Sequence, residues 1–195
     1  MLRLYHRDKA GRPLRVRWAL EEAGADYDFA VMTQEEGEGE EHKQRHPLGR
    51  VPVLETEDGF LFESAALCLQ VADLHPEANL IPPPGTYERG LVYQWTVWAM
   101  SELEPAIIRA YTAVQAGDAE RTASTQERLM NLFAALEKTL DGHDFVTGDD
   151  FTIADVVVGG VLVAARRREL MPDSPNVNAY LDRLDARPAK QRAYA

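Results

Sequence analysis

Hydrophobic and polar positions alternate in two short runs near the start of the chain, residues 2–5 and 27–32, and this spacing predicts β-strands. Between the two runs, apolar residues recur every three or four positions, which predicts a helix. Pro13 suits the first turn of that helix, because the N–H that proline lacks is not needed there, and Gly24 is a typical C-terminal cap. The glutamate-rich stretch of residues 34–44 is predicted to be a mobile loop with at most one helical turn.

Residues 51–55 and 60–62 form two further apolar runs, and the Asp-Gly pair between them predicts a β-hairpin. Ser64 stands where another apolar helical pattern begins. The resulting order is strand-helix-strand followed by strand-strand-helix, which predicts an α/β domain over residues 1–78.

The pattern changes after a proline-rich segment at residues 82–85, and helical spacing then dominates. Residues 91–100 are apolar almost all round, which predicts a buried helix. Thr152 and Asp155 have the spacing of a capping box at the start of another apolar helix. We therefore expect residues 84–195 to form a second, all-helical domain.

The chain of 195 residues carries 21 Lys and Arg against 32 Asp and Glu, a net charge of −11, which argues against nucleic-acid and anionic-membrane partners. The first residues lack the apolar stretch of a signal peptide, and charges interrupt every longer apolar run, so we expect a cytoplasmic protein. The single cysteine, Cys68, excludes an intramolecular disulfide and a cysteine-based zinc cluster. The five histidines lack metal-ligand spacing, so we expect them in loops and expect no bound metal.

Four segments, in this order and at these spacings, resemble the cytosolic glutathione S-transferases, and most of all bacterial members of that family. Residues 11–24 look like the family's first helix, and residues 46–54 resemble its Asn-Pro-x-Gly-x-Val-Pro-x-Leu segment, with His46 in place of the usual Asn. Residues 62–69 resemble its Glu-Ser-x-Ala-Ile segment, and residues 148–155 resemble its capping box. The resemblance covers essentially the whole chain and implies a thioredoxin-like α/β N-terminal domain followed by an all-α C-terminal domain.

The resemblance also implies a function, in which glutathione is the co-substrate and its thiol attacks a small hydrophobic electrophile in detoxification. Val51 with a cis Pro52 would then pair with the cysteinyl backbone of glutathione. Glu63 and Ser64 would hold its γ-glutamyl end, and Arg50 is a candidate for its glycyl carboxylate. From the residues alone, a trans proline, an ordinary serine cap and a surface arginine stay open as alternatives.

The group that stabilises the thiolate is the least defined part of this site. The position at which the family carries Ser or Cys falls on Gly11, which has no side chain. Tyr5 lies near the position of the family's catalytic tyrosine, although a tyrosine packed within the α/β domain is the alternative. Arg12, at the positive end of the first predicted helix, is the other candidate. Cys68 is expected to be a buried structural thiol, so the reactive sulfur would be that of glutathione.

Trp98 and Tyr111 are candidates for the wall of a hydrophobic substrate pocket, with packing in the helical core as the alternative. The resemblance further implies a homodimer, in which the α/β domain of one chain faces the helical domain of the other. The absence of a side chain at Gly11 motivates an alternative function, that of a non-catalytic binding or stress-regulatory protein with the same fold.

Overall fold

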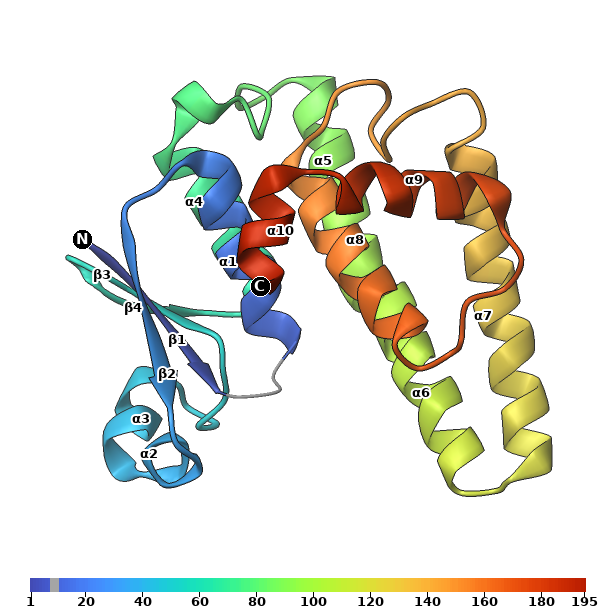
Figure 1. Cartoon of the computed structure of the whole chain (residues 1–195), viewed down its shortest axis with the longest axis horizontal. Coiled ribbons are helices and arrows are strands. Elements are labelled where there is room, and N and C mark those ends of the chain that lie inside the picture. Colours follow the sequence, from blue (N-terminus) through green and yellow to red (C-terminus); the bar gives the residue numbers. More distant parts are fainter. Residues whose placement is uncertain (8–10) are drawn as a thin grey trace. The chain divides into compact units, whose positions relative to one another are not determined.

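The computed structural model describes residues 1–7 and 11–195 (Figure 1). The chain divides into two compact units. The first consists of residues 1–81 together with 188–195, and the second consists of residues 82–187.

The first unit is built on a four-stranded sheet with the order β2-β1-β3-β4. Its strands are β1 (Leu2–Arg7), β2 (Tyr27–Met32), β3 (Val53–Thr56) and β4 (Gly59–Phe62). β1 runs parallel to β2 and antiparallel to β3, and β3 and β4 form the predicted hairpin. The sheet is therefore mixed, as a strand-helix-strand unit followed by a hairpin requires.

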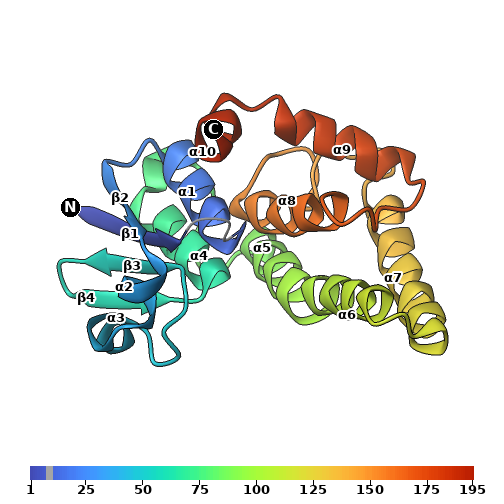
Figure 2. The same ribbon diagram turned by 60° about the horizontal axis from the view of Figure 1, so that its bottom comes forward.

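Helices cover both faces of this sheet (Figures 1 and 2). On one face lie α1 (Gly11–Ala23) and α4 (Ser64–Leu74), which pack against each other, and a short 3-10 turn, η1 (Pro76–Ala78), follows α4. Leu4 and Leu54 are register partners and are completely buried in the core. Because successive side chains of a strand point to opposite faces, the next residue, Tyr5, lies on the other face, where it packs with Met32 and Val53.

The glutamate-rich stretch forms two short helices, α2 (Gln34–Glu38) and α3 (Glu40–Arg45), so the prediction of a mobile loop is wrong. The physical reason is a capping box at the start of α2. The Thr33 hydroxyl accepts the Glu36 N–H, and the Glu36 carboxylate accepts the Thr33 N–H at 2.7 Å. As a consequence His42 is a buried residue of α3 and not the loop residue that was expected.

The last helix, α10 (Pro188–Tyr194), belongs to the first unit, whereas the sequence assigned residues 84–195 to the helical domain. α10 packs along α1, and the Arg192 guanidinium bonds the Glu21 carboxylate of α1 at 2.7 Å. Periodicity along the chain does not indicate the element against which a terminal segment packs.

The second unit is helical, as predicted. Its helices are α5 (Tyr87–Trp98), α6 (Glu104–Gln115), α7 (Ala119–Thr139), α8 (Ile153–Arg166) and α9 (Pro175–Asp185), and a π-helical turn, η2 (Ala99–Leu103), joins α5 to α6. The apolar helix α8 lies between α5 and α9 and is buried along most of its length (Figure 2). No helix formed by residues 1–7 and 11–195 is long and apolar enough to cross a membrane.

Helix α5 is less buried than its apolar sequence predicts. Val92 and Thr96 are buried on one side, whereas Val97 is 61% exposed and Tyr93 is 44% exposed on the other. The expectation of a helix buried all round is therefore wrong. Tyrosine and tryptophan have an apolar body and a polar tip, so a run of such residues suits a partly exposed helix as well as a buried one.

Candidate functional site

Two polar chain segments of the first unit meet where the β3–β4 hairpin ends. Val53 is the register partner of Phe62, so Val51, two residues before β3, and Ser64, two residues after β4, flank the same end of the hairpin. The Val51–Pro52 peptide bond is cis, as the resemblance implies. The backbone before β3 and the first residue of α4 therefore border the same site.

Ser64 stands at the start of α4 and is buried. Its hydroxyl oxygen accepts a hydrogen bond of 3.4 Å from the Arg15 guanidinium, which leaves the hydroxyl hydrogen to donate to another acceptor. The N–H groups in the first turn of a helix have no partner within the helix, and the helix dipole favours negative charge there. The start of α4 is therefore suited to binding a carboxylate.

Glu63, the residue before Ser64, has φ 72° and ψ 106°. A positive φ is rare for a residue other than glycine, and it costs of order 1–3 kcal/mol. Such conformations cluster at functional sites, where the surrounding structure holds them. The Glu63 side chain is exposed, so its carboxylate lies at the surface next to the start of α4.

The start of α1 approaches the same place. Gly11 is its first residue, and Arg15, one turn later on the same side of the helix, reaches Ser64. Gly11 and Arg12 are exposed, and a Cβ atom added to Gly11 would meet no heavy atom within 4 Å. The position at which the family carries a catalytic side chain therefore has room for one.

Cys68 lies one turn inside α4 and is completely buried, as predicted. Its thiol donates a weak hydrogen bond of 3.7 Å to the Arg15 carbonyl oxygen. Burial raises the pKa of Cys68 to about 12. Because the thiolate is the nucleophilic form, Cys68 is an unreactive structural residue.

Tyr5 is engaged by side chains of the first unit. Its hydroxyl donates a hydrogen bond of 2.7 Å to the Glu55 carboxylate, and the Arg45 guanidinium lies 4.5 Å from the centre of its ring. Burial, together with Glu55, raises the pKa of Tyr5. The Tyr5 O–H is therefore engaged by Glu55 and its ring is packed within the α/β domain, which favours the packing alternative over a catalytic role.

Two histidines that the sequence analysis placed in loops hold the backbone that precedes Val51. His42 Nε2 lies 2.9 Å from the Arg50 carbonyl oxygen, and His46 Nδ1 accepts the Leu48 N–H at 3.0 Å. The Arg50 side chain itself is exposed. The one signal in the sequence was His46 at the family's asparagine position; nothing in the pattern pointed to His42.

The two pocket candidates lie in the second unit, Trp98 on α5 and Tyr111 on α6. The Trp98 ring makes an edge-to-face contact with Trp95, with 5.1 Å between the ring centres. Tyr111 is 36% exposed, and the Arg168 guanidinium lies 5.2 Å from the centre of its ring. Both aromatic rings are therefore partly engaged within the helical unit.

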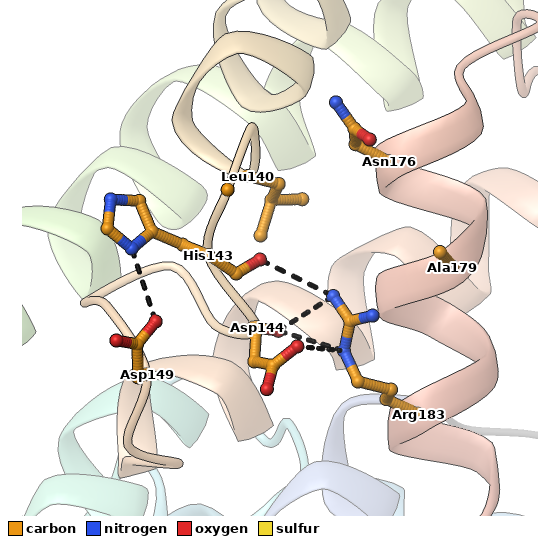
Figure 3. Close-up of a pocket in the computed structure, with 8 residues that line it drawn as sticks. Leu140, His143, Asp144, Asp149, Asn176, Ala179 and Arg183 are labelled. Atoms are coloured by element: carbon orange, nitrogen blue, oxygen red, sulfur yellow. Dashed lines mark hydrogen bonds and ion pairs between the residues drawn. The ribbon is translucent and has the colours of Figure 1, made fainter.

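A cavity of about 300 Å³ opens in the second unit (Figure 3). It is lined by Leu140, Gly142, His143, Asp144, Asp149, Asn176, Ala179 and Arg183. From α9, Arg183 donates to the carbonyl oxygens of His143 and Asp144, while the His143 ring faces the Asp149 carboxylate at 3.3 Å. Because these groups are paired with one another, they brace the loop between α7 and α8. Within residues 1–7 and 11–195, no three His, Cys, Asp or Glu side chains gather as metal ligands.

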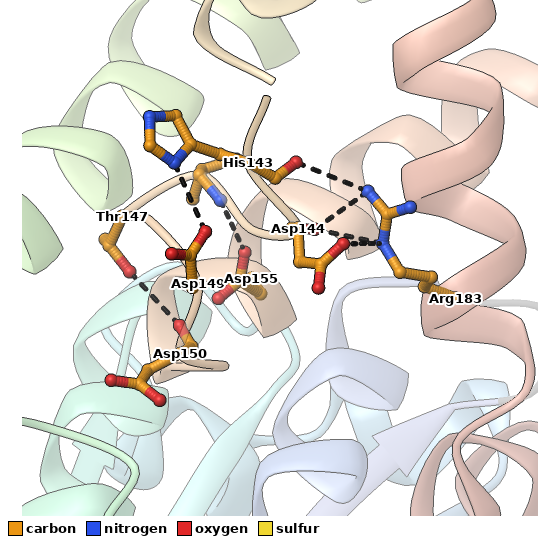
Figure 4. A network of polar contacts seen from close by, with 8 residues as sticks. His143, Asp144, Thr147, Asp149, Asp150, Asp155 and Arg183 are labelled. Carbon is orange, nitrogen blue, oxygen red and sulfur yellow. Dashed lines mark hydrogen bonds and ion pairs between the residues drawn. The ribbon is translucent and has the colours of Figure 1, made fainter. Parts of the chain in front are cut away.

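The buried Asp155 carboxylate anchors the same loop (Figure 4). It accepts the Thr152 N–H at 2.8 Å, which completes the predicted capping box of α8. It also accepts the Val146 N–H at 3.1 Å and the Tyr180 O–H at 2.9 Å. One carboxylate therefore joins the loop, α8 and α9.

The fold defines a class of protein, in which a thioredoxin-like α/β unit is combined with a helical unit. The family model of the glutathione S-transferase N-terminal domain matches residues 1–73, and that of the C-terminal domain matches residues 106–183. The chain is 30% identical to glutathione S-transferase 4 of Zea mays over 190 residues, which cover 91% of this chain and 85% of the relative. The chain therefore belongs to the glutathione S-transferase family.

Solved structures agree with this assignment. The glutathione transferase from Methylococcus capsulatus str. Bath has a TM-score of 0.85 and is 28% identical, covering 99% of this chain and 97% of that one. A sphingomonad glutathione S-transferase complexed with glutathione has a TM-score of 0.84 and is 29% identical, covering 98% of this chain and 96% of that one.

The Asp155 network yields a prediction for stability. Asp155→Asn should lower the free energy of unfolding by about 3 kcal/mol, because an amide N–H₂ would face donors that now meet a carboxylate. Tyr180→Phe should lower it by about 1 kcal/mol, because one hydrogen bond is lost. Urea unfolding measures both, with Asp141→Asn, an exposed aspartate, as the neutral control. An Asp155→Asn variant as stable as the wild type would contradict the anchoring role.

The position of Tyr5 yields a second prediction. Tyr5→Phe should lower the free energy of unfolding by about 1 kcal/mol, because the hydrogen bond to Glu55 is lost. The same variant should leave kcat with glutathione unchanged, since the hydroxyl already donates to Glu55. Steady-state kinetics test this, with Tyr87→Phe, a 77% exposed tyrosine, as control. A large loss of kcat would instead indicate that the Tyr5 hydroxyl donates a hydrogen bond to the glutathione thiolate.

Proposed function

We propose that this chain is a glutathione S-transferase, which binds glutathione in its first unit and activates the thiol for attack on an electrophile. The main support for this proposal is the hydrogen bond from Arg15 to Ser64. It links α1 to the first residue of α4, near the backbone of Val51. Two helix N-termini and an adjacent backbone segment suit a peptide that carries carboxylates and a thiol.

Each end of glutathione has a residue suited to it. The γ-glutamyl carboxylate binds the Ser64 hydroxyl and the N–H groups that begin α4, and the exposed Glu63 carboxylate pairs with the γ-glutamyl ammonium. The N–H and carbonyl of Val51 pair with the cysteinyl backbone as an added strand would. Arg50 is exposed where it precedes Val51, and its guanidinium suits the glycyl carboxylate.

The thiolate is stabilised at the start of α1. A free thiol has a pKa near 8.5, so positive electrostatic potential is needed to favour the thiolate at neutral pH. The N–H groups of Gly11 and Arg12 begin the helix, and the Arg12 guanidinium adds a full positive charge. The thiol proton passes to solvent, and the thiolate sulfur forms a bond to the electrophilic carbon. The bond from that carbon to its leaving group breaks, and the leaving group departs with the electron pair, as chloride does from chlorodinitrobenzene.

The second substrate in this proposal is a small hydrophobic electrophile. Trp98 and Tyr111 support it, because large aromatic rings with accessible surface are typical of sites for apolar ligands. The Arg168 guanidinium over the Tyr111 ring adds a positive charge beside that aromatic surface.

A homodimer is also part of the proposal, as is a cytoplasmic location. β4 lies at an edge of the sheet and carries Phe60, Leu61 and Phe62, each about 40% exposed. An edge strand with exposed apolar side chains is a typical surface for association with another chain.

The binding step is tested with Ser64→Ala. The variant should raise the dissociation constant for glutathione roughly 10- to 100-fold, because a hydrogen bond to a charged carboxylate is lost. Isothermal titration calorimetry measures the constant, with Ser124→Ala, an exposed serine of α7, as the matched control. A wild-type protein that does not bind glutathione would overturn the proposal. Binding without turnover of chlorodinitrobenzene would favour the non-catalytic alternative.

The activation step is tested by filling the space at Gly11. In Gly11→Ser a hydroxyl donor is added at the start of α1, and the new Cβ meets no atom within 4 Å. The variant should raise kcat/KM roughly two- to tenfold and lower the pKa of bound glutathione by up to about one unit. Ultraviolet absorbance of the thiolate against pH measures that pKa. Gly11→Ala fills the same space without a donor and should leave kcat/KM and the pKa of bound glutathione unchanged. Equal effects in the two variants would contradict the proposal that the thiolate lies at the start of α1.

A further inference from the structure

Two buried histidines, His42 and His46, lie four positions apart at the end of α3. His42 is completely buried and His46 is 5% exposed. Both bond the short segment that leads into Val51, and neither takes part in the function proposed above.

His42 bonds the last residue of this segment, Arg50. Its Nε2 lies 2.9 Å from the Arg50 carbonyl oxygen, and since a carbonyl only accepts, Nε2 carries the hydrogen. The carbonyl of the residue directly before Val51 is therefore fixed to α3.

His46 bonds the first residue of the segment, Leu48. Its Nδ1 accepts the Leu48 N–H at 3.0 Å, a bond from a side chain to the backbone two residues on, as asparagine makes in turns. The Gly49 N–H bonds the His46 carbonyl oxygen at 2.8 Å, and Gly49 has φ 58°, which suits glycine. The turn is thus closed by a ring nitrogen that accepts only while it is unprotonated.

We propose that His42 and His46 are positioning residues for glutathione: they hold residues 48–50 so that Val51 meets the cysteinyl backbone, and protonation of His46 weakens binding. This inference rests on the proposed function, and it adds a pH dependence to that site. The two hydrogen bonds fix both ends of the segment. If one is lost, the backbone becomes less ordered, and glutathione binding must then supply the entropy cost of ordering it for strand-like pairing.

The surroundings of His46 set the direction of this dependence. Burial lowers its pKa below the ordinary value of 6.5; Glu63, at the start of α4, raises it, and His42 and Arg50 lower it further. The fourth neighbour, Phe62 of β4, is uncharged and lies 4.7 Å from the ring. The net pKa is lowered, so the turn is intact above pH 6.5 and is lost as the pH falls through the pKa of the folded protein.

The test is calorimetric binding of S-methylglutathione between about pH 7.5 and about pH 5, the range in which histidines titrate. This ligand has no thiol, and its carboxylates stay ionised over the range, so a change in affinity reports on the protein. Wild-type protein should bind more weakly at the lower pH, by up to about fivefold, the effect of one backbone hydrogen bond.

Two variants of His46 separate positioning from general stability. His46→Asn keeps an acceptor for the Leu48 N–H but does not titrate, so its affinity should match the wild type at the higher pH and stay constant as the pH falls. His46→Leu has no acceptor and should bind about fivefold more weakly at every pH. In turnover assays it should raise KM for glutathione and leave kcat unchanged. His143→Asn, at an exposed histidine of the second unit, is the control and should keep the wild-type pH profile.

His42 is tested in the same way. His42→Gln keeps a donor for the Arg50 carbonyl and should bind S-methylglutathione as the wild type does, whereas His42→Phe should bind it about fivefold more weakly. Thermal unfolding followed by circular dichroism, at each pH, shows that the variants compared are folded.

The outcomes are distinct. Wild-type binding that does not change with pH, or a His46→Asn variant that keeps the wild-type pH dependence, would overturn this inference and leave the proposed function standing. Absence of binding by the wild type at about pH 7.5 would instead overturn the proposed function, and with it this inference.

Discussion

The contact between the Arg15 guanidinium and the Ser64 hydroxyl is the interaction on which the site depends. It joins the second turn of α1 to the first residue of α4, and the two helices pack against each other. The whole chain carries a net charge of −11, which repels an anionic ligand at long range. An anion site in such a protein needs short-range donors in fixed places, and the N–H groups at helix N-termini are donors of that kind.

Around this pair of helices, the backbone before β3 is held by side chains and not by regular structure. Hydrogen bonds from the His42 and His46 side chains fix this backbone, where a strand would be fixed by backbone hydrogen bonds to its neighbour. Such a segment is ordered only while its side-chain partners keep the correct protonation state and tautomer. The segment before β3 thus depends on the protonation state of these side chains, whereas β3 itself is paired with β1 and β4.

The sequence predicted what depends on local periodicity and missed what depends on packing. The hairpin at residues 51–62 and the capping box of α8 follow from short-range chemistry, and both are present. The two helices in residues 34–45 were not predicted, because the high glutamate content indicated a loop. The capping box of Thr33 and Glu36, which begins α2, was not recognised. The docking of α10 on α1 and the bond from Tyr5 to Glu55 join residues far apart in sequence, and periodicity carries no information on either.

The same limit explains why the thiolate stabiliser was the hardest residue to predict. A motif search looks for side chains, and it finds Gly11 where a hydroxyl or thiol is usual. In the structure Tyr5 is engaged by Glu55, and Gly11 carries no side chain at the start of α1. Helix N–H groups are present whatever the residue type, and they act on a thiolate through the same dipole that serves a carboxylate at α4. A site that relies on backbone donors therefore tolerates glycine at a position where sequence comparison expects a catalytic side chain.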